Sequence, residues 1–189
     1  MFLGRESRAG DRGQGSETAD WGFGYPVGMA VDVKRVSLRP LSFSIVDQAM
    51  AEIERVAAAA LAGKATCKGN WEVGQIFGHL AHWIQWGFDG SPVHPPWFVR
   101  LLGPLMKRKV LNGKSPQGFR LPGAAEGTYG VEKLSVEEGL RRCREQFARL
   151  KAGAPAIPNE VFGRMTHEEW IKLHLRHAEG HLGYVEIGK

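Results

Sequence analysis

The histidines are the residues in this chain of 189 whose type and spacing could do chemistry. Three of the seven lie near the C-terminus, at positions 174, 177 and 181. His177 and His181 are four residues apart, which on a helix places two imidazole nitrogens one turn apart on the same face, the usual geometry for two ligands of one metal ion. His79, from an apolar segment earlier in the chain, could supply a third nitrogen. Three histidine ligands leave coordination positions open for water and substrate, as catalytic sites do.

The same residues also allow a structural interpretation. A single histidine in a helical core more often has hydrogen-bond partners than a metal, and two histidines four residues apart can arise by chance. His174, one turn before the pair, could be a spare ligand, a hydrogen-bond donor to a ligand or a residue on the bundle surface. His82 lies one turn after His79 and has the same alternatives. His94 and His167 are predicted to be surface residues.

Four amphipathic helices are predicted to position these histidines. Each begins at a residue that favours helix N-termini and carries apolar residues at helical spacing. The helices run from Ser44 to about Leu61, from Asn70 to Asp89, from Ser135 to Gly153, and from Thr166 to about Val185. Four such helices with one long connection predict an all-α fold, a four-helix bundle. No strand is predicted; only residues 31–38 have the pattern of an extended arm.

The long connection joins the second and third helices and contains an extra short helix. This piece runs from Trp97 to Leu111, and the pair Gly103-Pro104 is predicted to interrupt it. Between Gly90 and Ala125 the chain has no acidic residue. It has six basic ones, Arg100, Lys107, Arg108, Lys109, Lys114 and Arg120. This stretch could receive an anionic ligand, but the alternative is an ordinary solvated surface. No nucleic-acid-binding motif accompanies it, so nucleic acid is not an expected partner.

Composition limits the class of protein further. The net charge is +5, and 43% of the residues are hydrophobic. Two cysteines are too few for a disulfide framework. The longest apolar run, Val56 to Ala62, is far below the roughly 20 residues of a membrane-spanning helix. We therefore expect a cytoplasmic protein with no membrane partner.

The first 28 residues differ in composition from the rest. They hold seven glycines and almost no aliphatic periodicity, so we predict a disordered leader. Met29 begins an ordinary protein sequence and is a candidate for the true translation start. The folded domain is expected to span residues 29–189.

Two motifs carry a resemblance to a known superfamily. The segment NWEVGQIFGHL, residues 70–80, resembles the second-helix signature of the DinB-like superfamily, in which a tryptophan opens the helix and a histidine follows about eight residues later. The segment RHAEGHL, residues 176–182, resembles the closing HxxxH motif of that superfamily. The run FDGSP at residues 88–92 and the segment 163–170 are similar to one branch known mainly as a domain of unknown function. The resemblance covers residues 35–187.

This resemblance implies a four-helix bundle with a divalent metal ion, commonly nickel or zinc. Carried over by position, the metal ligands are His79, His177 and His181. Characterised members include S-transferases and an isomerase in which the metal activates the thiol of a small cofactor, and members are often dimers. The expected function is therefore a metal-dependent thiol transferase or hydrolase-like enzyme acting on a small-molecule substrate, with a low-molecular-weight thiol as a second cofactor and a homodimer as the assembly. The alternatives are a non-catalytic metal- or ligand-binding bundle and a stress-response partner protein.

Two further expectations concern the surroundings of the site. No carboxylate in the motifs is an obvious general base; Glu72, Glu179 and Asp89 are candidates by proximity in sequence alone. Five tryptophans are interpreted as core and rim packing rather than as a cage for substrate. These are Trp71, Trp83, Trp86, Trp97 and Trp170.

Overall fold

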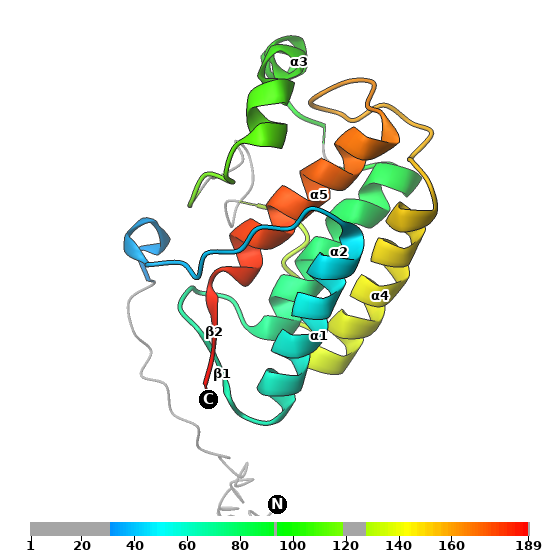
Figure 1. Cartoon of the computed structure of the whole chain (residues 1–189). Helices are drawn as coiled ribbons and strands as arrows, with labels where there is room; N and C mark the ends of the chain where they lie inside the picture. Colours follow the sequence, from blue (N-terminus) through cyan, green and yellow to red (C-terminus); the bar gives the residue numbers. More distant parts are fainter. Residues whose placement is uncertain (1–30, 93, 119–127, 189) are drawn as a thin grey trace, which may run out of the picture.

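The computed structural model describes residues 31–92, 94–118 and 128–188. Four helices form a bundle: α1 (Val46–Leu61), α2 (Val73–Asp89), α4 (Val136–Ala152) and α5 (His167–Leu182). A fifth, α3 (Trp97–Asn112), lies in the connection between α2 and α4 and contacts α5 at the edge of the molecule (Figure 1). The predicted four-helix bundle with an extra helix in a long crossover is confirmed. The predicted leader, residues 1–28, lies outside the described residues, as does Arg120.

The core lies where the four bundle helices meet. Its largest side chains with almost no exposed surface come from all four helices: Ile53, Phe77, Ile84, Phe147, Leu175 and Leu182. α2 packs most extensively on α4, and it also contacts α5 and α1. This buries α2 along most of its length and places its residues opposite those of α5. None of the described helices is long and apolar enough to cross a membrane.

A small two-stranded sheet was not predicted. β1 (Ala65–Cys67) pairs antiparallel with β2 (Val185–Ile187), with Cys67 opposite Val185. Consequently α5 ends at Leu182, three residues earlier than expected, because Val185 belongs to β2. The predicted extended arm is also partly wrong: Val33–Arg35 forms a 3-10 turn, η1, capped by Asp32.

The predicted helix starts are correct where the cap residue bonds to the first turn of its own helix. Ser135 and Thr166 cap α4 and α5, and Thr166 forms a full capping box with Glu169. The predicted cap of α2 is wrong: Glu72 caps this helix with Gln75. Asn70 instead exchanges two hydrogen bonds with the backbone of Val31. For α1, Ile45 takes the cap position with no side-chain bond, so the cap predicted at Ser44 is wrong as well.

The crossover helix is continuous. α3 includes Pro104 within its 16 residues, so the predicted interruption at Gly103-Pro104 is wrong. Gly103 is buried, and a Cβ atom there would lie 2.0 Å from the carbonyl oxygen of Val161. Only glycine permits so close an approach. The glycine therefore serves to dock α3 on the segment between α4 and α5 rather than to break the helix.

Candidate metal centre

Three imidazoles converge between α2 and α5. The nitrogens that His79, His177 and His181 can offer to a metal all lie within 4.8 Å of one another. Nε2 of His79 is 3.1 Å from Nε2 of His177, although the two residues are 98 positions apart in sequence. The ring of His181 lies edge-on to both, with centroids 4.6 Å from His79 and 4.7 Å from His177. The structure therefore brings the three predicted site residues into one cluster, an arrangement compatible with a metal site.

A backbone carbonyl fixes the orientation of His79. Its Nδ1 lies 2.9 Å from the carbonyl oxygen of Tyr129. A carbonyl can only accept, so Nδ1 carries the proton and donates it, and Nε2 keeps a free lone pair directed at the other two rings. Metal-ligating histidines almost always donate their second ring nitrogen in this way. Tyr129 was not predicted as a functional residue, because a backbone acceptor has no side-chain signature in the sequence.

The members of the cluster differ in burial. His79 is buried, with 1% of its surface exposed. His177 and His181 in the second half of α5 are half-buried. The cluster therefore lies nearer the molecular surface at α5 than at α2.

Burial keeps the three imidazoles neutral. Desolvation lowers the pKa of His79 to about 2, and repulsion from His181 acts in the same direction. Desolvation also lowers the pKa of His181 to about 4 and holds that of His177 well below its ordinary value. The hydrogen bond to Tyr129 opposes the shift at His79 without reversing it. Neutral imidazole is the form that binds a metal ion, so the cluster is ready to bind one at neutral pH.

Two tryptophans wall the cluster. The ring of Trp71 stacks on His181 with an interplanar angle of 3° and a centroid distance of 5.2 Å. Trp83 presents its edge to His79 at 5.9 Å and to His177 at 5.7 Å. The indole Nε1 of Trp83 is buried and has no hydrogen-bond partner among the described residues. These two side chains are therefore part of the site, whereas Trp97, predicted to pack in the core or at its rim, is 76% exposed.

The remaining histidines lie outside the cluster. His174 is 4% exposed and stacks on Trp170 with ring centroids 5.9 Å apart. Its Nε2 has no hydrogen-bond partner in the part of the chain that the structure describes. It is thus a core residue and not on the bundle surface. His82 stacks on Trp86. His167 is half-buried rather than at the surface, because its Nε2 lies 2.6 Å from the carbonyl oxygen of Leu150.

The three candidate bases are engaged elsewhere. Glu72 caps α2, and Asp89 pairs with Arg149 at 2.7 Å. Glu179 accepts hydrogen bonds from the backbone N–H of Phe43 and from Arg176. Among the described residues, the potential metal-binding group consists of the three histidines and contains no acid. A proton acceptor from these carboxylates is therefore not part of the site.

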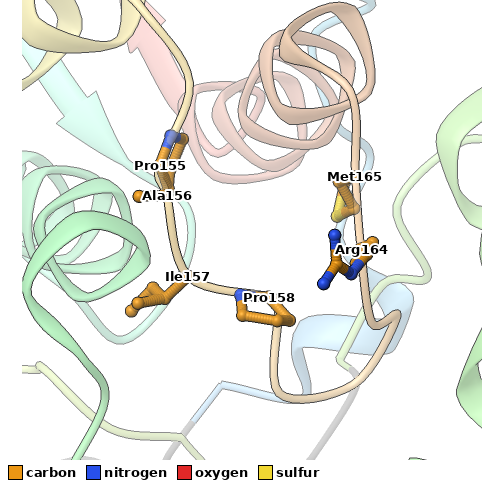
Figure 2. A pocket seen from close by; sticks show the side chains of 6 residues that line it. All are labelled: Pro155, Ala156, Ile157, Pro158, Arg164 and Met165. Atoms are coloured by element: carbon orange, nitrogen blue, oxygen red, sulfur yellow. The ribbon is translucent and has the colours of Figure 1, made fainter.

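Two hollows lie away from the histidines. One, of about 210 Å³, lies between residues 155–158 on one side and Arg164 and Met165 on the other (Figure 2). The other, of about 620 Å³, borders the small sheet and is lined by Arg39 and Glu186 among others. Neither is lined by a histidine of the cluster, so neither is part of the candidate site.

The fold and the site together define a helical-bundle protein with a three-histidine cluster. The chain matches the sequence model of a family described as "Protein of unknown function (DUF1569)" over residues 35–187, and it therefore belongs to that family. The matched range contains the four bundle helices and all three histidines. No curated protein and no solved structure matches the chain. The likeness to the DinB-like superfamily thus stays a resemblance of the motifs.

Proposed function

We propose that this protein binds one divalent metal ion, such as zinc or nickel, through His79, His177 and His181, and that it uses the ion to activate a thiol or a water molecule toward a small-molecule substrate. The observation that carries the proposal is the convergence of three neutral imidazoles from two helices, one of them oriented by the carbonyl of Tyr129. Imidazole nitrogen suits zinc and nickel well. The DinB-like resemblance supports the choice of a thiol.

The spacing of the nitrogens fits a bound ion. Two imidazole nitrogens on a tetrahedral zinc ion lie about 3.3 Å apart, given Zn–N distances of about 2.0–2.1 Å. The 3.1 Å between the Nε2 atoms of His79 and His177 is close to that separation. In the metal-free protein the same distance allows His177 to donate a hydrogen bond to His79. For this pair, the two states require little rearrangement of the side chains. The three nitrogens together lie within 4.8 Å of one another.

The residues of the chain have separate tasks in this proposal. The three histidines would hold the ion, and a site with three protein ligands leaves a coordination position for a further group. The ion, when bound, supplies Lewis-acid activation of a thiol or water at neutral pH. Trp71 and Trp83 fix the imidazole planes through ring contacts and limit the access of bulk water. The buried N–H of Trp83, which has no partner among the described residues, would be available to donate a hydrogen bond to a bound group.

A second candidate is a metal-binding bundle without catalysis. It is favoured by one observation: the three candidate carboxylates are engaged in a helix cap, an ion pair and backbone contacts, so none of these three serves the site as a base. In a thiol transferase the thiol loses its proton on binding, so a dedicated base is not required. The two candidates differ in whether the open position accepts a thiol.

Cobalt substitution tests the proposal. The tag-free protein is loaded with Co²⁺ and titrated with a small thiol, and a thiolate-to-cobalt charge-transfer band in the near ultraviolet is the expected result. The His177→Ala variant should show neither cobalt binding nor the band. His94→Ala is the matched control, because His94 is exposed and remote from the cluster. Cobalt binding without the band would exclude the thiol activity and leave water activation or a non-catalytic site, and no cobalt binding would remove both candidates.

A further inference from the structure

α3 carries an apolar face that no other described part of the chain covers. Ten large hydrophobic residues are exposed in the described structure, and six of them lie on this one helix. They are Trp97, Phe98, Leu101, Leu102, Leu105 and Met106, with exposed fractions from 46% to 78%. Contiguous apolar surface of several hundred Å² on one element marks an interaction site rather than scattered surface residues.

The opposite face of α3 packs against the rest of the chain. Gly103 and Leu111 are buried, and Gly103 packs against the backbone of Val161. Lys107 pairs with Glu169 of α5 at 2.9 Å. α3 is thereby anchored at the edge of the molecule, beside α5 (Figure 1). Its apolar face is directed away from the bundle and has no partner within the described chain.

The exposed residues follow the spacing of a helix–helix seam. Phe98, Leu101, Leu105, Arg108 and Asn112 succeed one another at intervals of three, four, three and four residues, and all five are exposed. This is the heptad pattern that packs one helix lengthwise against another. Trp97 and Phe98 lie in the first turn of α3, and Arg108 and Lys109 lie in its last turns.

We propose that this face binds α3 of a second copy of the chain, in antiparallel orientation, around a twofold axis at the level of Gly103. Residues equally distant from position 103 then face each other across the axis. Leu101 meets Leu105 of the second copy, and Phe98 meets Arg108. A twofold interface requires such a self-complementary patch, because the same surface serves both subunits.

The charges favour the antiparallel orientation of two copies. Residues 90–118 contain no acid, so a parallel pair of α3 helices would place cations against cations. The antiparallel pair places Arg108 and Lys109 of one copy over the rings of Phe98 and Trp97 of the other, a favourable cation–π arrangement. The chain already contains such a contact, since Arg149 lies 4.3 Å from the ring centre of Phe88.

An anionic membrane surface fits the same face less well. Interfacial helices keep their cations on the polar edges, where they reach the headgroups while the apolar arc is immersed. In α3, Arg108 lies on the seam itself, in line with Leu101 and Leu105. Immersion of that arc would carry the guanidinium into the apolar layer.

Sedimentation velocity of the tag-free full-length chain over a range of concentrations tests the proposal. The wild-type chain should form dimers, and Leu105→Asp should raise the dissociation constant at least about thirtyfold, because it removes two central contacts at once. Ile45→Asp is the matched control: Ile45 is also exposed, at 53%, but lies at the start of α1. This variant should dimerise like the wild type. Far-ultraviolet circular dichroism verifies that both variants fold.

Disulfide trapping tests the orientation. In the antiparallel register, a mixture of Leu101→Cys and Leu105→Cys chains should cross-link with oxidised glutathione faster than either chain alone. Faster linking of each chain to itself would contradict this register. A wild-type chain that is monomeric at every concentration, or one that binds phosphatidylserine vesicles without dimerising, would overturn the proposal. So would dimers that persist unchanged in Leu105→Asp. These outcomes do not depend on metal binding, since the same results are expected with and without a chelator.

Discussion

His79 is the residue on which the candidate metal centre depends most at the scale of single side chains. It is the one fully buried member of the cluster, and Tyr129 fixes its proton on Nδ1. His177 and His181 lie one turn apart on a helix surface, a spacing that is common in helices without metal. The imidazole of His79, which approaches them from α2, makes this pair part of a candidate metal site.

Removal of His181 tests the cluster without disturbing the core. Zinc at a hundredfold excess over its dissociation constant should stabilise the wild-type fold by about 2.7 kcal/mol, since the ion binds the folded chain. His181→Ala should keep its helical circular dichroism, because His181 is half-buried at the end of α5, but should gain little stability from zinc. Thermal unfolding with and without zinc measures the difference. An equal zinc-dependent shift in both proteins would show that His181 is not a ligand.

His174 should make the metal-free protein sensitive to acid. Burial lowers its pKa to about 3 in the folded state, against about 6.5 in the unfolded chain. Between these values the unfolded chain binds more protons, so the free energy of unfolding falls as the pH falls from 6.5 toward 3, by up to about 1.4 kcal/mol per pH unit for one such group.

His174→Phe isolates this contribution. The substitution keeps a ring against Trp170 but cannot take up a proton, so the stability of the variant should fall less steeply below pH 6.5. Urea unfolding of the chelator-treated proteins at pH 7, 6, 5 and 4 compares the two slopes. Identical slopes would mean that His174 is not held neutral by burial.

The sequence could predict the ligands but not the groups that orient them. His177 and His181 lie in a helix whose phase is regular, so their shared face follows from their spacing. Tyr129 acts through its backbone, and Trp83 becomes part of the site only because α2 and α5 are neighbours. The alternatives for His174 could not be separated from spacing alone, because they differ in the rotation of α5 within the bundle.

At the scale of elements, two glycines allow α2 and α4 to approach closely. A Cβ atom on Gly139 would lie 2.8 Å both from the carbonyl oxygen of Gly74 and from the Cβ of Phe77. A Cβ atom on Gly74 would lie 2.1 Å from the carbonyl oxygen of Leu134. This close contact sets the depth of α2 in the bundle, and with it the position of His79.

Gly139→Ala should therefore destabilise the fold. Alanine favours a helix over glycine by about 1 kcal/mol, but the added methyl group forces the two helices apart, and such overpacking costs about 1–3 kcal/mol. Gly153→Ala is the control, because nothing lies within 4 Å of its Cβ position and its backbone is extended. Chemical denaturation should show a loss of stability for Gly139→Ala alone. A stabilised Gly139→Ala variant would contradict the close packing.

The sequence predicted the start residues of some helices correctly, but not those of others, and it did not predict the strands. Ser135 and Thr166 cap their own helices, so local sequence places those starts correctly. Asn70 is hydrogen-bonded to Val31, which lies 39 residues away in sequence, and Glu72 is the N-cap residue of α2 instead. The strands have three residues each, too few to show an alternating pattern.

At the scale of the whole molecule, the segment after α5 holds the C-terminal end of that helix in place. β2 pairs with β1, and Arg39 donates hydrogen bonds to the carbonyls of Leu182 and Val185 just beyond His181. Arg39 is itself paired with Glu52 of α1. The site therefore combines two helices of the bundle with a C-terminal segment that fixes the end of α5, where His181 lies.

Elemental analysis of the tag-free protein tests the central claim most directly. The wild type and His94→Ala should each carry about one zinc, nickel or similar ion per chain after supplementation with metal, and His177→Ala should carry none, since two imidazoles alone bind such an ion weakly. A stoichiometric ion retained in His177→Ala, or no ion in any of the three proteins, would contradict the assignment of His79, His177 and His181 as metal ligands.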